Sequence, residues 1–309
     1  MSGPFHVGEQ WVQSRAGVRD KVEQIGSRMI RSVMPEQHRE FFARLPAVLL
    51  AAVDSEGQPH ASIVWGAPGF AWSPHPALLC VEASVSADDP VAPLLRPQAA
   101  VGLLGLEMPT RRRNRLNGRV VERDERGFSV AVAQSFGNCP KYIQAREWQP
   151  SPRLPGLVVA GEGMDDRWLA LVQAADTFFI ASQSPDANGG GADVSHRGGA
   201  PGFVRYGVDG RLWVPDYSGN QLFNTLGNLT REPRCGLLFI DFDTGDLLHL
   251  QARAELVWPE HYAALNLNPP RGAERMLALT PGRWTLRYAG LPLSFSEPEA
   301  SPFFPREEG

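Results

Sequence analysis

Hydrophobic residues are spaced differently in the first 45 residues and in the rest of the chain. Between residues 8 and 45, apolar side chains such as Val22 and Ile25 recur at helix-like intervals, with charged residues between them. This spacing predicts helices, because it places the apolar side chains on one helical face. Pro35 and Pro46 interrupt the pattern, so we expect the helical segment to end there.

From residue 46 onward, short apolar runs alternate with turn residues. Residues 47–53 form such a run, a polar turn cluster follows, and a second run covers 61–65, so residues 47–65 are predicted to form a β-hairpin. Further strands are expected at residues 78–81, 99–106 and 116–122. The 31 glycines and 27 prolines favour many turns over long helices. The predicted fold class is mainly β with flanking α-helices, built from small barrels or sandwiches.

The β-rich part of the chain contains an internal repeat. The pentapeptide Gly-Ala-Pro-Gly-Phe occurs at residues 66–70 and again, unchanged, at 199–203. Three further matches occur in the same order: 49–51 with 179–181, 101–104 with 235–238, and 117–119 with 251–253. A small change in their spacing predicts an insertion around residues 188–191. These matches predict two copies of one β unit, at about 47–122 and 176–257. The alternative is that the pentapeptide only marks two similar turns.

The segment between the two copies differs in composition. Residues 129–148 are predicted to begin as a helix, and residues 150–163 form a link rich in proline and glycine. We therefore expect three parts. A helical segment covers 1–45, a first β unit with a helical linker covers 46–150, and a second β unit with a C-terminal extension covers 151–309.

Charge and cysteine content argue against several functional classes. The 34 acidic and 30 basic residues give a net charge of −4, which does not predict a nucleic-acid surface. The arginine run at 111–115 is expected to be solvated on a β-turn, or to face a phosphate of a nicotinamide donor. The three cysteines and seven histidines lack the spacing of a metal site. No apolar stretch reaches the length of a membrane span, so we expect a cytoplasmic protein without a metal, membrane or nucleic-acid partner.

The second copy is the more polar one, and this difference locates a candidate site. Ser195 has a counterpart in Ser62, but Arg197 stands where the first copy has Val64, and Gly198 follows it. A hydroxyl, a guanidinium and backbone amides beside a glycine are groups that can hold a phosphate. The alternative is that the arginine only forms a surface ion pair and the glycines only turn the chain.

Further polar residues follow in the second copy. Asp216, which with Asp193 could pair Arg197 at the surface, precedes a group of side-chain amides. These amides can donate to and accept from a polar ring edge or a sugar chain, and they belong to Asn220, Gln221 and Asn224.

Cys139 and Lys141 are candidate catalytic residues. They flank Pro140, which is expected at the first turn of a short helix. A thiol near a helix start with a lysine beside it would be activated, and the lysine could neutralise an anion. The alternative is a buried small residue beside a solvent-facing lysine.

At these residues the sequence resembles the pyridoxamine 5′-phosphate oxidase-like family of FMN-binding split barrels, and within it the flavin-nucleotide-binding branch. Four stretches carry the resemblance: 193–204 (DVSHRGGAPGFV), 213–220 (WVPDYSGN), 228–241 (NLTREPRCGLLFID), and 113–119 together with 135–144. The resemblance covers roughly residues 40–260. It implies two tandem split β-barrels that form a pseudo-dimer within one chain, with FMN between them.

The resemblance also implies roles for individual residues. Ser195 and Arg197 would meet the FMN phosphate or ribityl chain. The full set of implied cofactor-binding residues is Ser195, Arg197, Gly198, Asp216, Asn220, Gln221 and Asn224. The C-terminal stretch 292–295 lacks the arginine-rich substrate motif of the vitamin B6 oxidase itself, so pyridoxamine phosphate is not the expected substrate. His196 stands where many relatives have proline.

The resemblance favours an FMN-dependent oxidoreductase that acts on an unidentified small molecule and takes electrons from NAD(P)H or a reductase. One alternative is a non-catalytic flavin-binding or electron-relay module for a partner reductase. Another is a pair of barrels that has lost flavin and binds a different small molecule. Whether the chain also forms a homodimer is left open by the sequence.

Overall fold

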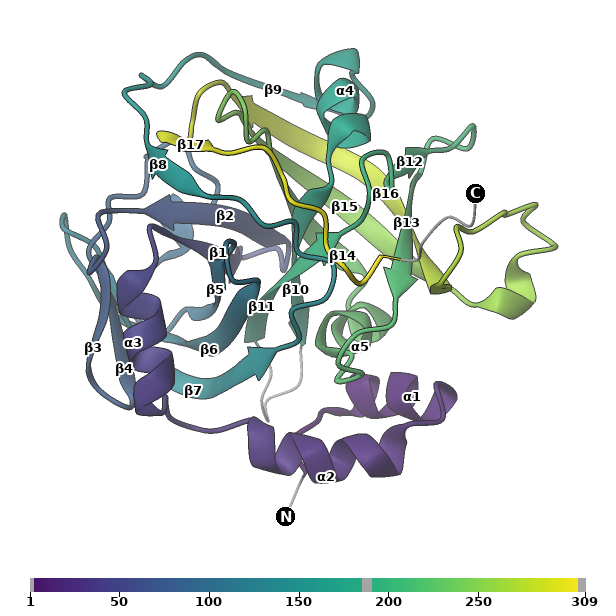
Figure 1. The fold of residues 1–309 in the computed structure, drawn as a ribbon, viewed down its shortest axis with the longest axis horizontal. Helices are drawn as coiled ribbons and strands as arrows, with labels where there is room; N and C mark the ends of the chain where they lie inside the picture. The colour runs from purple at the N-terminus through teal and green to yellow at the C-terminus, as the bar shows by residue number, and fades with distance from the viewer. Residues whose placement is uncertain (1–2, 185–190, 305–309) are drawn as a thin grey trace.

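The computed structural model describes residues 3–184 and 191–304, and its fold is mainly β with helices at the periphery (Figure 1). Three helices come first: α1 (Val7–Arg15), α2 (Arg19–Met29) and α3 (Glu36–Arg44). They confirm the helical segment that the apolar spacing predicts. The mainly β fold class is confirmed as well. The insertion expected around 188–191 falls almost wholly on residues 185–190, which lie outside the described residues.

Most strands belong to two large sheets. The sheet of the first β unit contains β1 (Ala47–Val53), β2 (Pro59–Trp65), β3 (Ala71–His75), β4 (Leu78–Val81), β5 (Ala100–Glu107), β6 (Arg112–Arg123) and β7 (Phe128–Asn138). The sheet of the second β unit contains β10 (Thr177–Ser184), β11 (Gly191–Gly198), β12 (Arg205–Tyr206), β13 (Leu212–Tyr217), β14 (Arg234–Ile240), β15 (Leu247–Val257) and β16 (Ala273–Arg287). The expected hairpin at 47–65 is the pair β1 and β2.

The two sheets have the same strand order. The first runs β2-β1-β5-β6-β7-β4-β3, and the second runs β11-β10-β14-β15-β16-β13-β12, which is the same path with each strand replaced by its counterpart. Both copies of the pentapeptide make the same turn. The amide of Gly66 donates to the Pro46 carbonyl over 3.0 Å, and the amide of Gly199 donates to the Asp176 carbonyl over 2.9 Å. The matched sequence segments therefore occupy matched places in two similar sheets.

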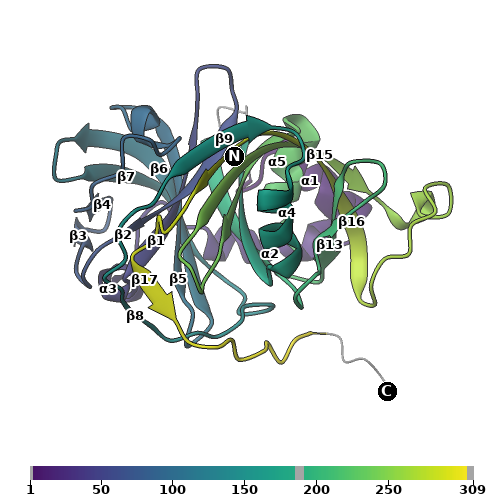
Figure 2. The same ribbon diagram turned by 90° about the horizontal axis from the view of Figure 1, so that it is seen from above.

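Alternation along the central strands builds three cores at once. In β1, Leu50 points into the core of the first unit, whereas Leu49 points into a core shared with the second unit. In β10, Ile180 lies in the core of the second unit and Phe179 in the shared one. Neighbouring residues of a strand face opposite sides, so nearly continuous apolar strands can bury both faces. The two units lie side by side in both views (Figures 1 and 2).

Both β units extend further than the repeat predicts. The helix expected from residue 129 is wrong, because residues 128–138 form β7, which is paired on both sides, with β6 and β4. Pairing with two neighbours overrides local helix preference. The helix expected around Pro140 is also wrong, since no helix lies between β7 and β8. The second unit continues to β16, well beyond residue 257.

Smaller elements cover the outside of the sheets. They are η1 (Ala92–Leu94), β8 (Trp148–Pro150), β9 (Val158–Glu162), α4 (Asp166–Ala174), α5 (Asn224–Arg231), η2 (Pro259–His261) and β17 (Leu293–Phe295). β9 pairs with β16, and β8 pairs with β17. Helix α1 packs on α5, where Gly8 and Gly227 permit close approach of the two backbones. Within the described residues, no helix has the length and apolar character needed to cross a bilayer.

Candidate functional site

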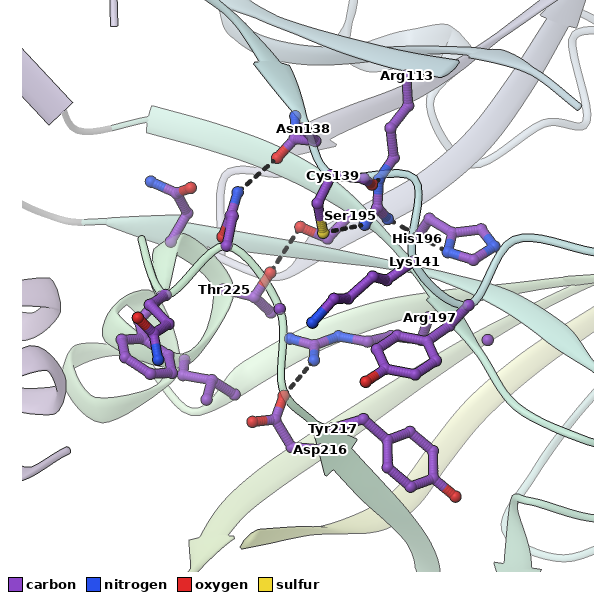
Figure 3. Close-up of a pocket in the computed structure, with 18 of the residues that line it drawn as sticks. Arg113, Asn138, Cys139, Lys141, Ser195, His196, Arg197, Asp216, Tyr217 and Thr225 are labelled. Carbon is purple, nitrogen blue, oxygen red and sulfur yellow. Dashed lines mark hydrogen bonds and ion pairs between the residues drawn. The ribbon is translucent and has the colours of Figure 1, made fainter. Parts of the chain in front are cut away.

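One cavity contains all nine residues that the sequence singles out. It lies where β6 and the segment after β7 in the first unit meet β11, β13 and the start of α5 in the second unit (Figure 3). These nine predicted residues, which line the cavity together with others, are Cys139, Lys141, Ser195, Arg197, Gly198, Asp216, Asn220, Gln221 and Asn224. The structure thus brings together side chains from several distant parts of the chain.

A buried part of the cavity wall is formed by two hydroxyls and an arginine from the other unit. Thr225, at the start of α5, donates its hydroxyl to Ser195 Oγ over 2.7 Å, and the guanidinium of Arg115 donates to the same oxygen. Arg115 Nη1 also donates to Asn224 Oδ1 over 3.0 Å. The first backbone amides of a helix have no partner within the helix, and no side chain caps this one at Phe223. Hydroxyls, a guanidinium and helix amides together form an anion-binding arrangement.

Arg115 is held in place by a buried carboxylate behind the cavity. Its Nη1 lies 3.1 Å from Asp193 Oδ1, and both side chains are nearly inaccessible to solvent. Asn117 donates to the same carboxylate oxygen over 3.2 Å. Burial lowers the pKa of Arg115 and raises that of Asp193, because a low-dielectric surrounding disfavours both charged forms. The pair fixes the arginine where the two units meet.

Arg197 lies in the cavity and is not a surface residue. Its Nη1 is paired with Asp216 Oδ1, and the other oxygen of that carboxylate lies 3.4 Å from Arg275 Nε. Figure 3 shows Arg197 reaching from β11 across the cavity to Asp216 on β13. The expectation of a surface ion pair is therefore half right: the partner is Asp216, but the pair lines the cavity.

Cys139 directly follows β7 and Lys141 lies in the turn after it, and their partners differ from those expected. Arg113 donates from Nε to the Cys139 carbonyl over 2.8 Å and from Nη2 to its Sγ over 3.5 Å. Lys141 Nζ donates to the Ser218 carbonyl over 3.3 Å. Without a helix at Pro140, the thiol has no helix start beside it, and its cationic neighbour is Arg113.

His196 closes the wall next to Arg113. Its Nδ1 lies 3.3 Å from Arg113 Nη1. Burial, together with the charges of Arg113 and Arg197, places the pKa of His196 well below its usual range. The ring is therefore neutral, and its Nδ1 accepts a hydrogen bond from the Arg113 guanidinium. A proline at this position could not make that contact.

The loop between β13 and α5 presents the amides to the cavity in a strained backbone. Gln221 and Phe223 have φ values of 62° and 60°, a region that costs a residue with a side chain about 1 kcal/mol or more. Asn220 bridges the units, since its Nδ2 donates to Asn138 Oδ1 over 3.1 Å, and its Oδ1 accepts from the Leu222 amide. This strain is maintained at the cavity edge, where the loop positions its polar groups.

Glycine is required where the loop after β7 crosses β11. A Cβ on Gly198 would lie 2.0 Å from the Tyr142 carbonyl oxygen. Gly219, by contrast, lines the cavity and has no atom within 4 Å of its notional Cβ. The first glycine lets two backbones meet, and the second leaves open space inside the cavity.

Positive charge predominates in the cavity and is incompletely paired. Arg113, Arg115, Lys141 and Arg197 line it, and Asp193 and Asp216 are the carboxylates in contact with them. Among the described residues, several buried donors around the cavity have no hydrogen-bond partner: Arg115 Nε, Asn138 Nδ2 and Arg197 Nε. Buried donors without partners are costly, so the cavity has both the charge and the donors to bind an anion.

A second layer extends from the cavity to the N-terminal helix. Glu9 on α1 accepts from Asn224 Nδ2 through Oε1 and from the His6 amide through Oε2, the latter over 2.9 Å. This contact orients the Asn224 amide, so that its oxygen faces Arg115. Burial raises the pKa of Glu9 to about 7. The N-terminal helices are thus part of the site's support.

Sequence reasoning missed three contributors: Arg113, Arg115 and Thr225. The turn expected for the arginine run contains Arg111, whereas residues 112–123 form β6. Alternation along β6 turns Arg113 and Arg115 to the same side of the strand. Their two-residue spacing was the available signal. No sequence signal identified Thr225. Its role depends on its place in the first turn of α5, which begins at Asn224. Among the described residues, no group of three or more side chains could hold a metal ion.

The fold and site define a class: a pair of similar β units with a cavity between them that is lined by cationic side chains. Comparison with known proteins names the family. Residues 164–288 match the family model described as pyridoxamine 5′-phosphate oxidase. The match falls on the second β unit and confirms the resemblance seen in the sequence.

Solved structures with a similar fold each match a part of the chain. An FAD-binding protein from Mesorhizobium loti is 12% identical, covers 44% of this chain and 100% of its own, and has a TM-score of 0.30. A general stress protein 26-related protein of the pyridoxinephosphate oxidase family from Clostridium acetobutylicum is 13% identical, covers 43% and 96%, and has a TM-score of 0.28. The heme storage protein from Vibrio cholerae is 13% identical, covers 38% and 90%, and has a TM-score of 0.27. No curated protein matches the chain.

Proposed function

We propose that the chain binds flavin mononucleotide in the cavity between its two β units and acts as an FMN-dependent oxidoreductase on a small molecule. The observation that carries the proposal is the excess of cationic side chains and unpartnered buried donors in a cavity bordered by the family-matched domain. A phosphate monoester carries close to two negative charges at neutral pH, which suits four cationic side chains set against two carboxylates.

Different groups of residues would contact the phosphate, the sugar chain and the ring of the ligand. Ser195, Thr225 and Arg115, with the amides that begin α5, would hold the phosphate, because Thr225 and Arg115 both donate to the Ser195 hydroxyl oxygen and so gather these donors at the helix start. Arg197 would add a second guanidinium from the opposite wall. The amide groups on the loop before α5 would meet the polar parts of the sugar chain and ring.

The chemistry of such a protein comes mainly from its cofactor. Bound flavin supplies hydride or electron transfer, and the chain supplies binding, orientation and charge. Lys141 reaches the cavity over Ser218 and Arg113 lies behind Cys139, so both cations are placed to offset negative charge that develops on a reduced ligand. With Arg113 as its nearest charged partner, Cys139 is the thiol placed to contact a bound substrate.

The absorbance spectrum and mass of whatever copurifies with the protein test this proposal. FMN released by denaturation, at close to one per chain, is expected. Bleaching of its visible bands by NADH or NADPH, followed by recovery in air, would show an oxidoreductase that takes electrons directly from a nicotinamide. A bound flavin that only a partner reductase can reduce would identify the electron-relay alternative. A colourless protein that cannot be reconstituted with FMN would refute the flavin proposal.

A further inference from the structure

The matched strand registers define a second position equivalent to the phosphate end of the cavity. Ser62 pairs with Leu50 as Ser195 pairs with Ile180, so the two serines occupy equivalent places on β2 and β11. In the first site, Ser195 is contacted by an arginine of the other unit, Arg115. A two-fold related arrangement must therefore place Ser62 next to residues from β15 and β16.

The structure shows that arrangement, with the first unit now supplying the serine and the second unit supplying the residues that face it. Leu104 pairs with Arg115 and Leu238 pairs with His249, so His249 is the counterpart of Arg115. By the same comparison, Arg287 on β16 is the counterpart of Asn138 on β7. The second position thus combines a serine from one unit with a histidine and an arginine from the other.

A carboxylate of the chain itself lies at the centre of this second position. Ser62 donates its hydroxyl to Asp89 Oδ2 over 2.5 Å, the bond that Thr225 makes to Ser195 in the first site. The same carboxylate oxygen lies 3.8 Å from Arg287 Nη1 and 4.0 Å from His249 Nε2. The four side chains of the second position, Ser62, Asp89, His249 and Arg287, are each more than nine-tenths buried.

The loop that carries Asp89 is also placed like the loop that begins α5. Both connect the fourth and fifth strands of their units, β4 to β5 and β13 to β14. Asp89 Oδ1 accepts from the amide of Val91 over 2.9 Å, directly before the short helix η1. The carboxylate therefore takes a place among helix-start amides, a serine hydroxyl and an arginine, which is where the first site would hold a ligand's phosphate.

We propose that the Asp89 carboxylate is an internal substitute for phosphate in a second, pseudo-symmetric anion site, so that the chain binds one phosphate-bearing ligand and not two. This inference rests on the proposed function for the assignment of the phosphate end of the first site. Val64, the counterpart of Arg197, and Leu247, the counterpart of Arg113, add no cation to the second position. Its fixed positive charge is Arg287, which the buried Asp89 and the half-exposed Asp88 already offset.

Removal of the carboxylate should convert this position into one that takes inorganic phosphate. The variant Asp89→Thr reproduces the residue type found at Thr225. It removes the buried carboxylate next to His249 and leaves Arg287 with the half-exposed Asp88 as its acidic neighbour. We expect it to unfold at a lower temperature than wild type in chloride buffer. Pro90 and His249 line a small pocket beside this position.

The unfolding midpoint is measured with and without inorganic phosphate at constant ionic strength. Phosphate at tenfold its dissociation constant should raise the midpoint of Asp89→Thr by about 2–4 °C more than that of wild type. The matched control is Asp88→Asn, since Asp88 lies 3.2 Å from Arg287 Nη1 but is half exposed. It should respond to phosphate as wild type does. Equal phosphate responses of Asp89→Thr and wild type would overturn the proposal.

A second variant covers the case in which Asp89→Thr does not fold. Asp89→Asn keeps the size of the side chain and loses its charge, so it should be less stable than wild type and phosphate should not restore it. An Asp89→Asn protein as stable as wild type, or one that phosphate does restore, would refute the internal substitute. These readouts need no flavin, so they are independent of whether the first site binds FMN.

Discussion

Arg197 offers the most direct test of the cavity, because it lines the space without being essential to the fold. Its side chain is 18% exposed and pairs with Asp216, which keeps a second cationic neighbour in Arg275 at 3.4 Å. Removing Arg197 therefore does not leave the carboxylate alone. We expect Arg197→Ala to lower the free energy of unfolding by only about 1 kcal/mol.

The effect on ligand binding should be much larger. A hydrogen bond to a charged group contributes about 1.5–3 kcal/mol, and about 1.4 kcal/mol corresponds to a tenfold change in affinity. The dissociation constant for FMN is therefore expected to rise about 10- to 150-fold in Arg197→Ala. Arg197→Lys retains the charge and loses the planar fork, so it should fall between this variant and wild type.

Titration of apoprotein with FMN, followed by quenching of flavin fluorescence, measures this constant. Arg211→Ala is the matched control, because Arg211 lies in the same β unit and pairs with Asp209 over 2.7 Å, but does not line the cavity. It should bind FMN like wild type. A dissociation constant for Arg197→Ala within about twofold of the Arg211→Ala value would refute the assignment of Arg197 to the flavin site.

Three further predictions concern the surroundings of the cavity. Ser62→Ala should leave FMN affinity unchanged but lower the free energy of unfolding by about 1–3 kcal/mol, because it removes the buried donor to Asp89; denaturant titration with parallel FMN binding checks this. The raised pKa of Glu9, about 7, means that the folded state holds a proton that the unfolded state releases above pH 4.5. Stability should thus fall by about 3 kcal/mol as pH rises from about 4.5 to about 7, and Glu9→Gln should remove this slope in urea titrations at several pH values. Gly198→Ala should displace the Tyr142 carbonyl and weaken FMN binding, which the same fluorescence titration measures; unaltered affinity would contradict the close backbone approach.

The repeat explains why so much of the site could be predicted from the sequence. The strands around the pentapeptide, and the polar differences between the copies, identified Ser195, Arg197 and the amides after Asp216, and all of them line one cavity. The prediction worked because residues equivalent in sequence are equivalent in strand register. Val64 shows that the fold accepts an apolar residue at this position, so the arginine at the equivalent position 197 indicates a function of the second copy.

The contributions of the first unit could not be obtained in this way. Within β7, Val130 and Phe136 are buried. The strand is stabilised by pairing with β6 and β4, which are distant in sequence, so the local sequence alone did not predict it. Arg115 is held at the cavity by its ion pair with Asp193 of the other unit, a contact that no local pattern contains.

The position of Arg115 also explains why two units are needed for one site. Ser195 and Thr225 come from the second unit, but the guanidinium that joins them comes from the first. A separate second unit would keep the hydroxyls and lose the buried ion pair of Arg115 with Asp193, leaving a carboxylate uncompensated at its surface. The shared apolar core between Phe179 and Leu49 therefore does more than stabilise the fold. It holds the two halves of the anion site at a fixed distance, and the site depends on that packing.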